Sequence, residues 1–184
     1  MTHFWITGGA STSNSAIISY YIDGEQTASI SYVPAMACGV GFTDNQGPWG
    51  NEWFGKGGSN GAWYNNFRIP FQKSINITFK FPPGINDDVI YMIVRGAENL
   101  PVSIGGVDIP VATGARMNLQ VVQGIYQPLE YINVVDIPTG SGMIFQHTLS
   151  FEAANLNTLE GCYHMYTPYN TPFPGLLLST GTEE

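Results

Sequence analysis

The chain has 184 residues, a formal net charge of −8 with only six Lys and Arg, and 11% charged residues. Nucleic acids and anionic membrane surfaces are bound through clustered cations, so the composition argues against both and favours neutral partners. No apolar run is as long as a membrane span, and residues 1–5 lack the basic start and apolar core of a signal peptide, so we expect no membrane insertion.

The surface is expected to be poor in charge, because an average globular protein has roughly 25% charged residues. Aromatic residues reach 13%, and glycine numbers 22. Scattered charge is the usual way in which a monomer stays soluble. We therefore expect a homo-oligomer that hides much of its exterior in subunit contacts, or a groove that faces a glycan.

Short strand patterns recur along the chain, and helical periodicity does not. The expected strands cover residues 3–7, 16–22, 27–33, 63–71, 75–81, 89–95, 117–125, 130–136, 143–151, 157–166 and 175–179. Between the second and the third, Asp23-Gly24 predicts a tight hairpin, because both residues tolerate the positive φ of a sharp reversal. Many short strands separated by turns predict an all-β sandwich or barrel.

A glycine-rich stretch, residues 39–61, is longer than an ordinary loop. It contains Trp49 and Trp53, and Trp63 follows just beyond it. Sugar rings stack their C–H faces on aromatic rings, so this stretch could form one wall of a furanose pocket. The alternative is that the three tryptophans pack over the end of a sandwich or into a subunit interface.

A break near residue 100, at Leu100-Pro101 and Gly105-Gly106, divides the chain into two expected sandwich units, residues 1–100 and 101–184. Five strands after the break are too few to close a sandwich. We expect a neighbouring subunit or a further piece of chain to cover the open edge.

Two carboxylates, Glu160 and Glu183, bracket a turn-forming stretch. Glu160 opens the strand-like run 162–166, Glu183 follows the apolar run 176–178, and residues 167–172 have the Pro and Asn chemistry of a chain reversal. A hairpin would bring the two glutamates together. Glycoside hydrolysis requires two carboxyl groups in one groove, one as nucleophile or base and one as proton donor. The alternative is that both are solvated surface charges.

Six segments in a fixed order carry a resemblance to a known family. They are residues 3–8 (HFWITG), 21–25 (YIDGE), 66–75 (NFRIPFQKSI), 92–96 (MIVRG), 159–162 (LEGC) and 178–183 (LSTGTE). The ordered set resembles glycoside hydrolase family 172, once catalogued as domain of unknown function 2961, over nearly the whole chain. The family usually has aspartate where this chain has Glu184, and it continues well past that point.

The resemblance implies a retaining, exo-acting enzyme on α-D-fructofuranosides, difructose anhydrides or α-D-arabinofuranosides. It further implies tandem jelly rolls, the second incomplete within this chain, that assemble in trimers or hexamers. Glu160 would be the nucleophile and Glu183 the acid/base.

Two further polar residues, Arg68 and His164, are site candidates. Arg68 could donate to a sugar hydroxyl or hold a carboxylate ionised, although a structural ion pair would look the same. His164 lies two residues from Cys162, but no second ligand pair has metal spacing, so we expect no metal and no cofactor. We place Arg68 and His164 with the three tryptophans in the expected substrate-binding set.

Cys38 and Cys162 allow a disulfide without requiring one. The sequon at residues 76–78 slightly favours an extracellular or secreted protein. The sequence thus predicts a retaining furanosidase that acts on a furanoside glycan, if further residues or a partner complete the chain. The alternative is a non-catalytic jelly-roll subunit, structural or glycan-binding, of an oligomer, shell or filament.

Overall fold

The computed structural model describes residues 1–12, 15–39, 48–58, 61–86, 88–111, 114–140, 142–152, 161, 163–166 and 176–179. The chain divides into two compact units, Met1–Ser150 and Phe151–Glu184. The regular structure consists mostly of antiparallel strands with very little helix, which confirms the all-β prediction. No helix in these ranges is long and apolar enough to cross a membrane. The tandem jelly-roll arrangement, with its division near residue 100, stays a prediction.

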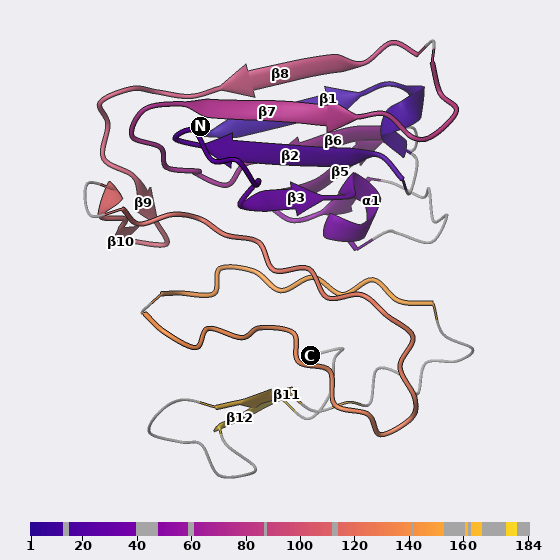
Figure 1. The fold of residues 1–184 in the computed structure, drawn as a ribbon, viewed down its shortest axis with the longest axis vertical. Helices are drawn as coiled ribbons and strands as arrows, with labels where there is room; N and C mark the ends of the chain where they lie inside the picture. Colours follow the sequence, from indigo (N-terminus) through magenta and orange to yellow (C-terminus); the bar gives the residue numbers. More distant parts are fainter. Residues whose placement is uncertain are drawn as a thin grey trace. The chain divides into compact units, whose positions relative to one another are not determined.

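Two antiparallel sheets form the body of the first unit (Figure 1). One has the strand order β4-β5-β6-β1-β8, and the other has the order β3-β2-β7. The larger sheet consists of β1 (His3–Thr7), β4 (Trp49–Gly50), β5 (Phe54–Gly58), β6 (Gly61–Asn65) and β8 (Tyr91–Arg95). The smaller sheet consists of β2 (Ile17–Ile22), β3 (Ile30–Tyr32) and β7 (Ile75–Lys80).

Short elements complete the described structure. The first unit also has the 3-10 turn η1 (Gly9–Thr12), the helix α1 (Pro34–Ala37) and a ribbon of β9 (Ser103–Ile104) with β10 (Val107–Asp108). Pro34 starts α1, where its fixed φ suits a first helical turn and its missing N–H costs nothing. The second unit contains β11 (Tyr163–Met165) and β12 (Leu176–Ser179).

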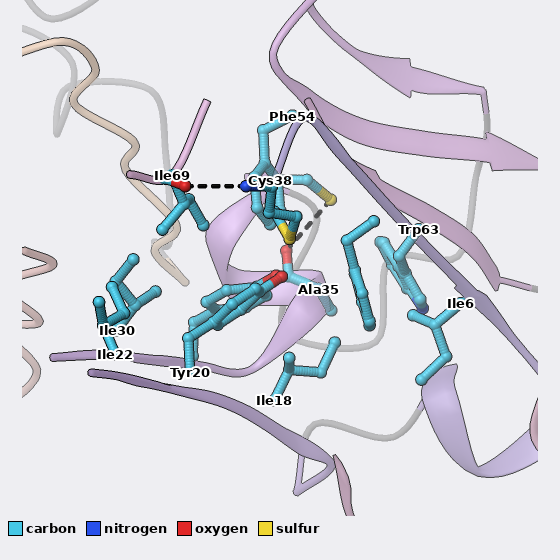
Figure 2. Packing of buried hydrophobic residues seen from close by; sticks show 13 residues of the cluster. Ile6, Ile18, Tyr20, Ile22, Ile30, Ala35, Cys38, Phe54, Trp63 and Ile69 are labelled. Atoms are coloured by element: carbon cyan, nitrogen blue, oxygen red, sulfur yellow. Dashed lines mark hydrogen bonds between the residues drawn. The ribbon is translucent and has the colours of Figure 1, made fainter. Parts of the chain in front are cut away.

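The hydrophobic core lies between the two sheets of the first unit and follows from period-two alternation. Buried and half-buried residues alternate along β1 and β2, and the buried ones, Ile6, Ile18 and Tyr20 among them, belong to one cluster (Figure 2). The Phe4 ring packs edge-on against Tyr20, with ring centroids 5.8 Å apart. Each fully buried large apolar side chain contributes about 1.5–3 kcal/mol relative to an exposed one. Burial of these alternate positions therefore fixes the register of both central strands, since a slip by one residue would expose them.

Buried polar groups in the core are hydrogen-bonded to one another. The hydroxyls of Tyr20 and Tyr32 lie 2.9 Å apart, and Asn65 Nδ2 donates to Tyr20 Oη at 3.3 Å. Burial raises the pKa of Tyr20 to about 12, although the hydrogen bonds with Tyr32 and Asn65 work in the opposite direction. The phenol therefore stays protonated, and the group ties β2, β3 and β6 together.

The turn predicted at Asp23-Gly24 is present, but β2 ends at Ile22 and β3 begins at Ile30, so the connection is longer than the tight hairpin expected. β2 pairs antiparallel with β3, with Ile18 opposite Tyr32. Asp23 and Gly24 have φ values of 55° and 87°, the left-handed conformation that the turn requires.

The strands expected at 117–125, 130–136 and 143–151 are wrong. The described residues of these ranges run without strand pairing, and Val121, Ile132 and Ile144 are exposed. The β-branched residues suit a pleated surface, but a strand needs a neighbour to complete its ladder. A second difference lies in the stretch 39–61, where β4, β5 and the start of β6 stand in place of part of the expected loop.

Candidate functional site

The two expected catalytic residues, Glu160 and Glu183, lie outside the described residues, as do Cys162 and Glu184. The strands that adjoin them in sequence are described. β11 and β12 pair antiparallel, with Tyr163 opposite Ser179 and Met165 opposite Leu176. This pairing is the one expected of a hairpin, and the chain reversal predicted at residues 167–172 lies outside the described residues.

A register shift falls between Tyr163 and His164, which lie opposite Ser179 and Leu177, so the extra residue of the irregularity is Leu178 on β12. Bulges bend a strand and re-aim its side chains, and they are common next to active sites. The His164 ring stacks on Tyr166, with ring centroids 6.5 Å apart and planes inclined by 15°. An aromatic surface thus accompanies the hairpin on the strand that follows Glu160.

The three tryptophans of the expected sugar-binding wall have different environments. Trp63 on β6 is 1% exposed, and its Nε1 donates to the Ser11 carbonyl at 2.8 Å. Trp53 is half-buried and stacks on Phe67, with ring centroids 5.7 Å apart. Trp49 on β4 is 59% exposed. Of the three rings, that of Trp49 is therefore the most accessible, and the burial of Trp63 is what the packing alternative expects of that residue.

Lys56 is a notable residue that sequence reasoning missed. It lies on β5, opposite Trp49 on one side and Trp63 on the other. Its side chain is buried, and Nζ lies 5.5 Å from the centroid of the Trp63 ring, within the range of a cation–π interaction. The available signal was a single lysine among glycines between two tryptophans, which gives no hint of burial.

Arg68 acts on the backbone of another segment. Its guanidinium donates to the Ser103 carbonyl at 2.8 Å, and the side chain is exposed. Near it, His3 Nδ1 lies 2.7 Å from Asn66 Oδ1, and Asn66 Nδ2 donates to the Glu52 carbonyl. Arg68 therefore links its loop after β6 to the backbone of β9, and its substrate-binding role stays a prediction.

Metal binding has no candidate in the described part of the chain, where no group of three or more His, Cys, Asp or Glu residues could hold an ion. Comparison of the chain with protein-family models, curated proteins and solved structures finds no match. The fold and the hairpin define an all-β protein with a bulged, aromatic β-hairpin between two glutamates. Any assignment of activity consequently rests on the residues themselves.

Proposed function

We propose that the chain is a retaining glycoside hydrolase that acts on α-D-fructofuranosides or α-D-arabinofuranosides, with Glu160 as nucleophile and Glu183 as acid/base. The proposal combines the resemblance to glycoside hydrolase family 172 with the chemistry of a carboxylate pair. The family's tandem jelly rolls and its trimeric or hexameric assembly belong to the same proposal.

The pairing of β11 with β12 is the observation that carries it. Tyr163 and Ser179 are partners in the register. Glu160 precedes Tyr163 by three positions and Glu183 follows Ser179 by four, so both glutamates adjoin the same end of the hairpin in sequence. At a rise of ~3.3 Å per residue, both stay within roughly 10–13 Å of that strand pair along the chain. The two carboxyls can therefore approach to the roughly 5 Å that retaining hydrolysis requires.

The proposed reaction is a double displacement. Glu160 attacks the anomeric carbon while Glu183 gives its proton to the departing oxygen, and a covalent glycosyl-enzyme forms. Glu183 then takes a proton from water, which attacks the same carbon and releases the sugar with its original configuration. Stacking surfaces such as His164 and Tyr166 would hold the furanose ring beside the carboxyls.

Two substitutions test the assignment. Glu160→Gln and Glu183→Gln are made separately in the full chain, and hydrolysis of an aryl α-D-arabinofuranoside and of a difructose anhydride is measured. Removal of an acid/base group costs about 10²–10⁴-fold in rate, and removal of the nucleophile costs at least as much. NMR of the first-formed product is expected to show retention of configuration.

Glu152→Gln provides the matched control, because Glu152 is an exposed carboxylate of the same unit. Its turnover is expected to equal that of the unmodified chain. Unchanged turnover in both the Glu160 and the Glu183 variants, or an inverted product, would exclude the proposed pair.

A second candidate function has its own observation. Large apolar side chains are exposed on β8 and along residues 119–151, Val94, Ile125 and Leu129 among them. In soluble proteins, exposed apolar side chains that gather into a large patch mark a surface that binds a partner. This observation favours the non-catalytic alternative, a structural or glycan-binding subunit of an oligomer, shell or filament. Assembly without hydrolysis of either substrate would favour this candidate over the enzyme.

A further inference from the structure

The first unit has an open side, formed by the terminal strands of its two sheets. β8 ends the larger sheet and β7 ends the smaller one, and Figure 1 shows both along one long side of the unit. All five residues of β8 are exposed, with Tyr91 at 63%. A terminal strand presents N–H and C=O groups that can pair with another strand.

The core face of the larger sheet continues onto β8 and is uncovered there. The register sets Val94 opposite Phe4 and Met92 opposite Ile6. Phe4 and Ile6 are buried, whereas Val94 and Met92 are 52% and 49% exposed. Because directly opposed residues share a face of the sheet, Val94 and Met92 extend the core beyond the part that the smaller sheet covers.

Residues 120–136, which we call the arm, belong to the same unit, and the two ends of the arm are hydrogen-bonded to each other. The Gln120 side-chain amide accepts from the Asp136 N–H and donates to the Asp136 carbonyl, both at 3.0 Å, and so imitates a strand pair. The turn is closed by the Glu130 carboxylate, which accepts from the Gln127 N–H at 2.8 Å. Within residues 130–136, Tyr131 and Val135 are exposed, and they would share one face if this segment is extended.

The charges of the arm complement those of the open side. Glu130 and Asp136 flank the apolar part of the arm, and Lys80 and Arg95 end β7 and β8; all four residues are exposed. The arrows of β7 and β8 point in opposite directions in Figure 1. Lys80 is the last residue of β7 and Arg95 the last residue of β8, so the two cations end oppositely directed strands. An extended segment from residue 130 to 136 spans ~20 Å and β8 spans ~13 Å, a difference that long Lys and Arg side chains bridge.

We propose that residues 130–136 of one copy of this chain add as an antiparallel strand to the free edge of β8 on a second copy. Antiparallel addition sets Glu130 beside Arg95 and Asp136 beside Lys80 of the second copy. In that register Tyr131 lies opposite Val94, so Tyr131 and Val135 share the face of Val94 and Met92 and cover the apolar surface left open there. Donor and acceptor are different surfaces, so the contact is head-to-tail and generates a ring or a filament. The inference does not depend on hydrolytic activity.

A charge swap tests the contact by sedimentation equilibrium of the full chain. Lys80→Glu and Asp136→Lys are each expected to raise the dissociation constant of the assembly about tenfold, because each turns an attraction into a repulsion. The double variant restores the pair in reverse and is expected to return the constant to within about twofold of the original. Glu98→Lys, a matched change at an exposed carboxylate outside the contact, leaves it unchanged.

If the double variant regains the original dissociation constant, the single variants lost the contact and were not misfolded. Two substitutions that each damaged the fold would not repair one another. Circular dichroism checks that each variant keeps its β structure. A monomeric unmodified chain at every concentration tested would overturn the proposal. Single variants that associate as well as the unmodified chain, or a double variant as weak as the singles, would also overturn it.

Discussion

The Asp23 carboxylate and the Arg116 guanidinium form an ion pair at 2.5 Å that joins the β2–β3 turn to the segment entering the arm. The same carboxylate accepts hydrogen bonds from the backbone N–H groups of Gln72, Lys73 and Ser74. Burial of the carboxyl raises its pKa, but the N–H groups of Lys73, Gln72 and Ser74 and the charge of Arg116 outweigh that effect and hold the pKa below its ordinary value. One side chain thus fixes three segments.

Asp23→Asn is expected to lower the free energy of unfolding by about 1–2 kcal/mol, because charge-assisted hydrogen bonds to a largely buried carboxylate are lost. A carboxyl whose pKa is depressed by folding contributes stability above its unfolded pKa, and that contribution is lost as the pH falls through the folded pKa. The unmodified chain is therefore expected to lose stability below about pH 4, and the variant to lose less over the same range. Urea unfolding at pH 7 and at pH 3 measures both effects.

Asp108→Asn serves as the control for Asp23, since Asp108 is an exposed carboxylate at the end of β10. Its substitution is expected to change stability by less than about 0.5 kcal/mol at either pH. Equal stability of Asp23→Asn and Asp108→Asn at pH 7 would show that the carboxylate does not hold the three segments.

Tyr20→Phe is expected to cost about 1–2 kcal/mol near neutral pH, because the Tyr32 hydroxyl and Asn65 each lose a buried hydrogen-bond partner. The pKa of Tyr20 is raised to about 12, so its contribution is complete below the unfolded pKa of about 10 and is lost as the pH rises through about 12. Part of the alkaline loss of stability should disappear in the variant. Chemical unfolding at pH 8 and at pH 11 measures this difference.

Tyr91→Phe is the matched control for Tyr20, because Tyr91 is 63% exposed on β8. Its stability and alkaline behaviour should equal those of the unmodified chain. An alkaline loss of stability that is the same in Tyr20→Phe as in the unmodified chain would contradict the role assigned to the buried phenol.

Arg68→Ala separates the structural and substrate-binding interpretations of Arg68. The exposed hydrogen bond to the Ser103 carbonyl contributes no more than about 1 kcal/mol, so stability should change little. Loss of a sugar contact would raise KM several-fold, whereas a purely structural role leaves KM unchanged. Steady-state kinetics on the aryl furanoside decides between them, and Lys73→Ala, another exposed cation, controls for the loss of positive charge.

The sequence was informative where pattern and local chemistry decide the structure. Alternating residues predicted β1, β2, β7 and β8, and Asp23-Gly24 predicted its turn. The Pro and Asn residues after Tyr166 predicted the pairing of β11 with β12. These features depend on period-two burial and on backbone conformations available to only a few residue types.

Features that depend on distant neighbours escaped the sequence analysis. β5 was missed because Gly55, Gly57 and Gly58 have low strand propensity, yet Gly55 is required where the Tyr64 hydroxyl and the Trp49 carbonyl would lie 2.6 and 2.5 Å from an added Cβ. Residues 117–151 have the composition of strands, but no pairing partner fixes them within the described residues. Burial of Lys56 follows from its place between β4 and β6, which no local pattern encodes.

Trp49→Ala and Trp63→Ala together test which tryptophan belongs to a sugar-binding surface. Trp63 is buried and hydrogen-bonded to Ser11, so its truncation should cost about 3–5 kcal/mol of stability. Trp49 is exposed, so Trp49→Ala should keep the unfolding free energy within about 0.5 kcal/mol, while loss of stacking raises KM for the aryl furanoside about tenfold. Urea unfolding and steady-state kinetics on both variants measure the two effects. A Trp49→Ala variant with unchanged KM would assign this residue to packing or to an interface instead.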